Sequence, residues 1–121
     1  LSLRGAFLLV VGPVPMFTFE DIRQCGVDDK QLCSVARGAR AKATGLIIAD
    51  LKAVAARHDN MLIFDPFSVL CPVGSERCDP SIKGVFMYRD RDHLNVYGAK
   101  LLAPALIDFL RRSGAVRPPG V

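Results

Sequence analysis

The chain is interpreted most directly from one stretch, Tyr88-Arg89-Asp90-Arg91-Asp92-His93-Leu94-Asn95-Val96-Tyr97-Gly98. It leads from an apolar, strand-like run into an amphipathic helix, and it places Asp90 three residues before His93, one of only two histidines. A turn with this spacing can bring both side chains to one side. The carboxylate can then hold one imidazole nitrogen and leave the other free to take a proton from a nucleophile. No convincing serine nucleophile motif accompanies the pair. The stretch therefore predicts part of a hydrolase or acyl-transfer site that lacks its attacking group.

Upstream of this stretch, short apolar runs alternate with a helical pattern. Buried strands are expected at residues 6–11, 61–64 and 84–88, the first two ended by Gly12-Pro13-Val14-Pro15 and Asp65-Pro66. Strands separated by helical or long connections predict an α/β domain with a parallel sheet. Ligands of such sheets bind beyond the carboxyl ends of the strands. The three strand ends, with the segment from Asp90 to His93 as the third, are therefore expected to share one edge of the sheet.

Two helices are expected. The first runs from about Ser34 to His58, and its apolar stripe is formed by Ile47, Leu51 and Val54, with Leu46 beside them. The second runs from Asn95, which is the N-cap, to about Arg112, and Pro104 is expected to kink it. Its inner stripe consists of Tyr97, Leu101, Ala105 and Phe109, widened by Leu102 and Leu106.

The acid–histidine stretch also has simpler interpretations. All three of Asp90, Asp92 and His93 could serve only to cap the following helix or to interact with its positive N-terminus. The same three side chains could ligate a metal, although no further ligands accompany them. His58, the second histidine, is expected to lie at a helix C-terminus on the surface. Tyr88 and Tyr97 are expected to be packing residues.

Four cysteines form two close pairs, neither with the C-x-x-C spacing of a zinc or redox site. Cys71 and Cys78 enclose a Pro/Gly loop that can return on itself, and a disulfide there would stabilise the fold by about 2–3 kcal/mol. We expect this bond, and with less support a second between Cys25 and Cys33. The alternative is four free thiols in a cytosolic protein, whereas local disulfides imply a periplasmic or extracellular setting.

Composition limits the classes of function. The 121 residues are 50% hydrophobic and 23% charged, which is typical of a globular domain. The net charge of +4 is spread along the chain and forms no basic face with stacking aromatics, so nucleic-acid binding is not expected. The chain opens at Leu1 directly into an apolar run too short to cross a bilayer, a beginning that suggests a cut through a longer protein.

The stretch from Tyr88 to Gly98 resembles the last conserved block of SGNH hydrolases. It is most similar to the block in SGNH domains fused to bacterial acyltransferase-3 membrane proteins, the polysaccharide O-acetylases. Asn95 stands where a serine is usual in that block, and it preserves the ability to cap. The segment Val11-Gly12-Pro13-Val14-Pro15 is similar to the family's strand end. Asp65, Leu70-Cys71 and Cys78 match an acid and the paired cysteines that precede the final strand.

The resemblance implies a three-layer α/β/α fold with a parallel sheet, SGNH- or flavodoxin-like and incomplete in this chain. Residues 1–115 would form the C-terminal part of one SGNH-type domain, and 116–121 a frayed tail. His93 matches the family's catalytic base and Asp90 its triad acid. The family's Gly-Asp-Ser nucleophile turn is absent from this chain, as are recognisable oxyanion-hole residues, so the chain alone is expected to be inactive.

In the intact parent, the resemblance implies a serine-dependent O-acyltransferase or esterase acting on cell-surface glycan, with no cofactor or metal. Its partners would be an acyl donor, a glycan acceptor, the upstream half of the domain and a transmembrane acyltransferase domain. The parent would lie in the inner or plasma membrane, with this domain periplasmic or extracellular. Two alternatives remain: a fragment of a stand-alone SGNH esterase, or a non-catalytic α/β module that binds glycan or supports a partner.

Overall fold

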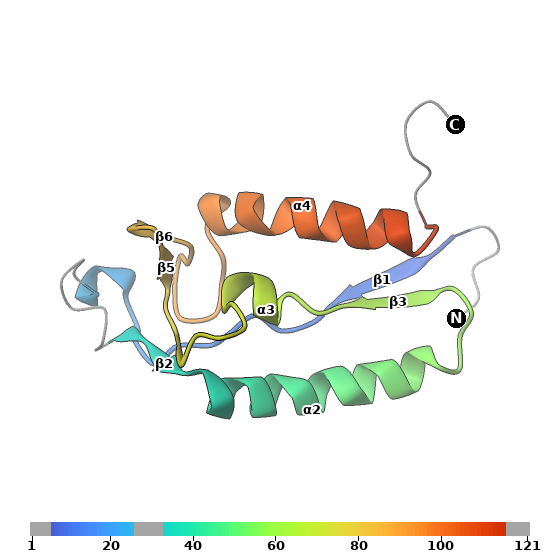
Figure 1. Cartoon of the computed structure of the whole chain (residues 1–121), viewed down its shortest axis with the longest axis horizontal. Coiled ribbons are helices and arrows are strands. Elements are labelled where there is room, and N and C mark those ends of the chain that lie inside the picture. The colour runs from blue at the N-terminus through green and yellow to red at the C-terminus, as the bar shows by residue number, and fades with distance from the viewer. Residues whose placement is uncertain (1–5, 26–32, 116–121) are drawn as a thin grey trace.

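The centre of the molecule is a pair of parallel strands between two long helices. A computed structural model describes residues 6–25 and 33–115. Strand β1 (Leu8–Val11) pairs in parallel with β3 (Met61–Phe64), with Leu8 opposite Met61 and Val11 opposite Phe64. Helices α2 (Arg37–Ala55) and α4 (Val96–Arg112) lie on opposite faces of this pair (Figure 1). The expected α/β class with a parallel sheet is therefore confirmed, in three layers.

The two strands are less buried than the apolar runs suggested. Leu8 and Val11 are 38% and 46% exposed, and Phe7, just before the strand, is 51% exposed. Within the described residues this sheet has two strands, so β1 and β3 each have one neighbour along the hydrogen-bonding direction. The prediction of a buried strand at residues 6–11 was wrong in this respect, because a strand is buried by neighbours that its own sequence does not reveal.

Helix α2 presents a different face to the sheet from the one expected. Its buried residues are Thr44 and Ile48, whereas Leu46, Ile47 and Val54 are between 44% and 65% exposed. Thr44 can be buried because its hydroxyl donates to the Arg40 carbonyl oxygen at 3.0 Å. Apolar residues occur on several sides of this helix, so their periodicity could not identify the face that packs.

The third expected strand is not part of the parallel sheet. Residues 84–88 contribute β6 (Val85–Phe86), which pairs antiparallel with β5 (Ser81–Ile82) in a separate hairpin. Both turn residues, Lys83 and Gly84, have positive φ angles of 53° and 79°, as a two-residue type I′ turn requires. The hairpin reverses the chain before it enters the segment that holds Asp90 and His93.

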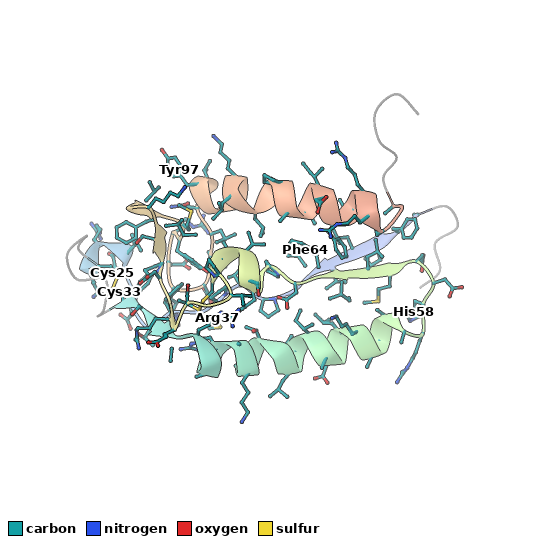
Figure 2. All side chains as sticks on the ribbon, viewed as in Figure 1. Cys25, Cys33, Arg37, His58, Phe64 and Tyr97 are labelled. Atoms are coloured by element: carbon teal, nitrogen blue, oxygen red, sulfur yellow. A yellow bond between two sulfur atoms is a disulfide. The ribbon has the colours of Figure 1, made fainter. Side chains whose placement is uncertain are left out.

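Helix α4 begins at the predicted residue, but the face that it buries differs from the predicted one. Asn95 is its N-cap, and its Oδ1 accepts from the Gly98 N–H at 3.0 Å. The buried positions are Gly98 and Leu102, and the Phe109 ring packs on Phe64 with 5.3 Å between centroids. The predicted inner positions Tyr97 and Leu101 are instead exposed, Tyr97 at 62% (Figure 2). The helix continues through Pro104 to Arg112.

The cysteines lie in the core and form both expected disulfides, Cys25–Cys33 and Cys71–Cys78. One buried cluster contains all four, together with Phe17, Phe19, Val35, Phe67, Met87 and Tyr88. The elements around it are short: η1 (Ile22–Gln24), β2 (Val35–Ala36), α3 (Phe67–Leu70) and β4 (Arg77–Cys78). β2 and β4 pair antiparallel, with Val35 opposite Cys78. Cystines therefore supply part of the apolar core at this end of the molecule.

The described residues do not reach the end of the chain. The frayed tail at residues 116–121 lies outside the described residues. No helix in the described part of the chain has the length and apolar character needed to cross a membrane.

Candidate active site

The segment between the hairpin and α4 is a tight loop closed by backbone hydrogen bonds. Tyr88 and Leu94 form an antiparallel bridge, and the Arg89 N–H donates to the His93 carbonyl oxygen at 2.8 Å. The Asn95 N–H donates to the Met87 carbonyl oxygen, and the Asn95 Nδ2 donates to that of Phe86 at 2.8 Å. These bonds fix both ends of the loop that carries Asp90 and His93.

Asp90 is held by the backbone of its own loop. Its Oδ1 accepts from the N–H groups of Asp92 at 3.1 Å and of His93 at 2.8 Å. The hydrogen bond from the Asp92 backbone is the main reason that the pKa of the Asp90 carboxyl falls to about 2. Asp90 is therefore a fixed, ionised carboxylate at neutral pH.

His93 turns its Nδ1 toward this carboxylate. Nδ1 lies 2.9 Å from Oδ1 and 3.0 Å from Oδ2 of Asp90, and 2.9 Å from Oδ1 of Asp92. Because the two ring nitrogens are on different sides of the imidazole, Nε2 is left for another group. The D-x-x-H spacing thus brings the side chains together, although in a loop before the helix instead of in its first turn.

Capping does not explain this cluster. Asn95 provides the side-chain cap of α4 through its bond from Gly98, one position before the first helical residue. Asp90 and Asp92 direct their carboxylates at His93, and Asp90 also organises the loop backbone. Within the described residues, the side-chain cap that the simpler alternative gave to Asp90, Asp92 or His93 therefore comes from Asn95.

The segment that follows β1 packs beside the loop, although the strand expected to lead into the loop belongs to the separate hairpin and not to the parallel sheet. The Phe17 N–H donates to the Arg91 carbonyl oxygen at 2.9 Å. A shallow depression of about 350 Å³ lies here, lined by Glu20, Asp90, Arg91 and Asp92. Sequence reasoning missed Glu20, because only the backbone contact at Phe17 brings it beside residues seventy positions later.

The remaining candidates have other roles or lie elsewhere. The Asp65 carboxylate accepts from the Phe67 N–H at 3.0 Å and so organises the start of α3. His58 follows the C-terminal end of α2 and lies at the end of the molecule opposite Cys25 and Cys33 (Figure 2). Tyr88 is buried, as expected for a packing residue, whereas Tyr97 is not.

The side chains of Asp90, Asp92 and His93 also form the one group of three potential metal-ligating residues found in the described residues. Their ligand atoms lie within 4.8 Å of one another. Both carboxylates already contact the imidazole at hydrogen-bond distance, and no fourth ligand from the described segments joins them.

One comparison with known proteins identifies the family of the chain. The chain matches the model of the SGNH domain of the type fused to AT3 domains, over residues 1–108. No curated protein and no solved structure matches it significantly. The match covers most of the chain and includes both strands of the parallel sheet, the two disulfides and the acid–histidine loop. The chain therefore belongs to the SGNH domain family whose members are fused to AT3 domains, a family of hydrolase and acyltransferase type.

Proposed function

We propose that this chain supplies the acid–base pair of a serine-dependent O-acyltransferase or esterase that acts on cell-surface glycan. In this proposal His93 is the general base and Asp90 orients it. The observation that carries the proposal is the contact of His93 Nδ1 with both oxygens of an Asp90 carboxylate that two backbone N–H groups hold in place. This is the arrangement in which a carboxylate fixes the tautomer of a catalytic imidazole.

The proposed reaction proceeds through a covalent acyl intermediate. A serine hydroxyl gives its proton to His93 Nε2 while its oxygen attacks the ester carbonyl of the acyl donor. The imidazolium then returns the proton to the departing alcohol, which leaves an acyl-serine. A glycan hydroxyl or water attacks this ester, again losing its proton to Nε2, and the serine leaves with that proton. Asp90 stabilises the imidazolium in both halves of the reaction and remains ionised throughout.

The serine and the oxyanion donors would come from outside this sequence, which contains no Gly-Asp-Ser. Residues 1–115 are then the C-terminal part of the domain. The exposed apolar residues at β1, among them Phe7, Leu8 and Val11, support this division, as does the two-stranded sheet. Sheets of two strands are marginal alone, and an unpaired strand edge accepts a further strand.

The setting that we propose is a membrane-anchored parent with this domain on the periplasmic or extracellular side. The family's fusion to AT3 domains supports a membrane-bound acyltransferase partner in the same protein. The two disulfides suit an oxidising compartment. A stand-alone esterase would use the same residues, whereas a non-catalytic glycan-binding module would leave the His93–Asp90 contact without a use.

The test is His93→Ala in the intact parent domain, with hydrolysis or transfer of an acetyl ester as the readout. Loss of the base should lower kcat by about 10²- to 10⁴-fold. The matched control is His58→Ala, which removes the other histidine and should leave kcat unchanged. Unchanged turnover in His93→Ala would refute the proposed base.

A further inference from the structure

The Asp92 carboxylate has no role in the proposed reaction, although it reaches the same ring nitrogen as Asp90. Its Oδ1 lies 2.9 Å from His93 Nδ1, equal to the shortest distance from Asp90. We propose that Asp92 is a second positioning residue, which together with Asp90 favours the Nδ1–H tautomer of the neutral His93 ring and so leaves Nε2 as the nitrogen directed to the nucleophile. The catalytic consequence rests on the proposed function, whereas the positioning itself does not.

The exposure of the imidazole explains why a second carboxylate matters. The His93 side chain is 62% exposed, so packing contributes little to fixing the ring. A single contact between exposed partners stabilises one geometry only weakly, because water competes for both. Asp90 also shares its Oδ1 with two backbone N–H groups. A second carboxylate close to the same ring nitrogen favours a proton on Nδ1 electrostatically, and so favours one tautomer and one ring orientation.

The loop fixes the backbone of Asp92 and, from there, its carboxylate reaches His93 Nδ1. The Asp92 N–H is bound to Asp90 Oδ1 at 3.1 Å, which ties the Asp92 backbone to the residue that it assists. Asp92 is 40% exposed and Asp90 39%, so neither carboxylate is more shielded from water. The other charged groups lining the adjoining depression are Glu20 and Arg91, one of each sign. The two neighbouring carboxylates therefore dominate the surroundings of Nδ1.

The positioning claim is tested on the intact domain by the ¹⁵N chemical shifts of both imidazole nitrogens of His93, at mildly alkaline pH and with EDTA present. In the wild type, Nδ1 of His93 should show the shift of a protonated ring nitrogen and Nε2 that of an unprotonated one. Asp92→Ala should lower the ratio of the Nδ1–H to the Nε2–H tautomer by about two- to five-fold, the range expected for one exposed contact. Asp92→Asn keeps a carbonyl oxygen near Nδ1, so its tautomer ratio should lie between those of Asp92→Ala and the wild type.

Internal controls separate positioning from general disturbance of the fold. The ring shifts of His58 should be the same in every variant, and Asp59→Ala, which removes the acid next to His58 in sequence, should leave His93 unchanged. Asp90→Ala serves as the positive control, with a fall in the ratio at least as large as that of Asp92→Ala. An Asp92→Ala chain with an unaltered tautomer ratio at His93 would overturn the proposal.

The catalytic consequence is measured separately in the intact domain. Asp92→Ala should lower kcat with KM unchanged, by at most the two- to five-fold by which it lowers the tautomer ratio, because the ring is in its productive tautomer and orientation for a smaller fraction of the time. Full kcat in Asp92→Ala beside a strongly impaired His93→Ala would overturn this consequence while the proposed base stands. Full activity in His93→Ala would instead refute the proposed function. The positioning by Asp92 would then be judged from the ¹⁵N chemical shifts alone.

Discussion

The rings of Phe17 and Tyr88 pack edge to face, with 4.8 Å between centroids and an interplanar angle of 81°. Phe17 belongs to the segment after β1, and Tyr88 immediately precedes the loop of Asp90 and His93. Edge-to-face aromatic pairs contribute about 0.5–1.5 kcal/mol beyond the area that they bury. This contact joins a strand end to the acid–histidine loop across seventy residues of chain.

The Tyr88 hydroxyl gives a first prediction. The residue is 2% exposed, its hydroxyl has no hydrogen-bond partner among the described residues, and burial raises its pKa well above the usual range. Tyr88→Phe removes an unsatisfied buried polar group while keeping the ring contact. We expect the free energy of unfolding to rise by about 1 kcal/mol in urea titrations. Tyr97→Phe, at an exposed ring, should change it by less than about 0.5 kcal/mol. A clear loss of stability in Tyr88→Phe would contradict the assignment.

Gly98 gives a second prediction, because only a glycine fits between α4 and the end of the hairpin. A Cβ atom at this position would overlap the carbonyl oxygen of Met87, which is backbone and cannot move aside as a side chain could. Gly98→Ala should destabilise the fold by about 1–3 kcal/mol, as overpacking does. Gly45→Ala is the matched control in α2, where the added Cβ meets nothing within 4 Å. It should stabilise by about 1 kcal/mol, since alanine is the better helix former.

The response of stability to acid is a third prediction. The pKa of Asp90 is about 2 in the folded chain, below the value of about 4 expected on unfolding. Its interactions therefore stabilise the fold fully above about pH 4, and this contribution is lost as pH falls toward about 2. Asp90→Asn should flatten the profile of unfolding free energy against pH in that window. The profile should not become level, because Asp21 has a pKa of about 2 through its side-chain hydrogen bond with Arg23. Superimposable slopes for wild type and Asp90→Asn below pH 4 would contradict the assigned interactions.

The bond between Cys71 and Cys78 gives a fourth prediction. The two residues are 0% and 1% exposed and link the loop after α3 to β4. The double substitution Cys71→Ala with Cys78→Ala should lower the free energy of unfolding by about 2–3 kcal/mol, the loop-closure value for a bridge of this span. Alanine avoids burying the hydroxyl that serine would add. In a background that carries Cys25→Ala and Cys33→Ala, protein that keeps Cys71 and Cys78 but is reduced should have the same free energy of unfolding as the Cys71→Ala, Cys78→Ala variant, because both lack the bond. An unaltered midpoint in the double variant would show that the bond adds nothing.

Local signals in the sequence predicted the features that depend on nearby residues. The strand cores at Leu8–Val11 and Met61–Phe64, the Asn95 cap and both disulfides agree with the structure. Each depends on an apolar run, a capping side chain or a short cysteine loop. The His93–Asp90 contact was predictable for the same reason, since three residues of separation limit how far apart the two groups can lie.

Features set by distant parts of the chain were not predictable in this way. The face that α2 buries depends on which side meets the sheet, and Leu46 and Ile47 are as apolar as Ile48, which is buried. The run at residues 84–88 has strand character, but its partner is its own neighbour across a two-residue turn. Glu20 joins the depression through a contact that no local pattern encodes.

The cystines that surround Phe17 and Tyr88 have a consequence for when the site is assembled. All four half-cystines are at most 3% exposed and share one buried cluster with the two rings that support the acid–histidine loop. Before oxidation, the chain must hold that loop without the cross-links beneath it. In the proposed periplasmic or extracellular setting, formation of the two bonds would stabilise this cluster, so the oxidation state of the chain and the stability of the acid–histidine loop would be coupled.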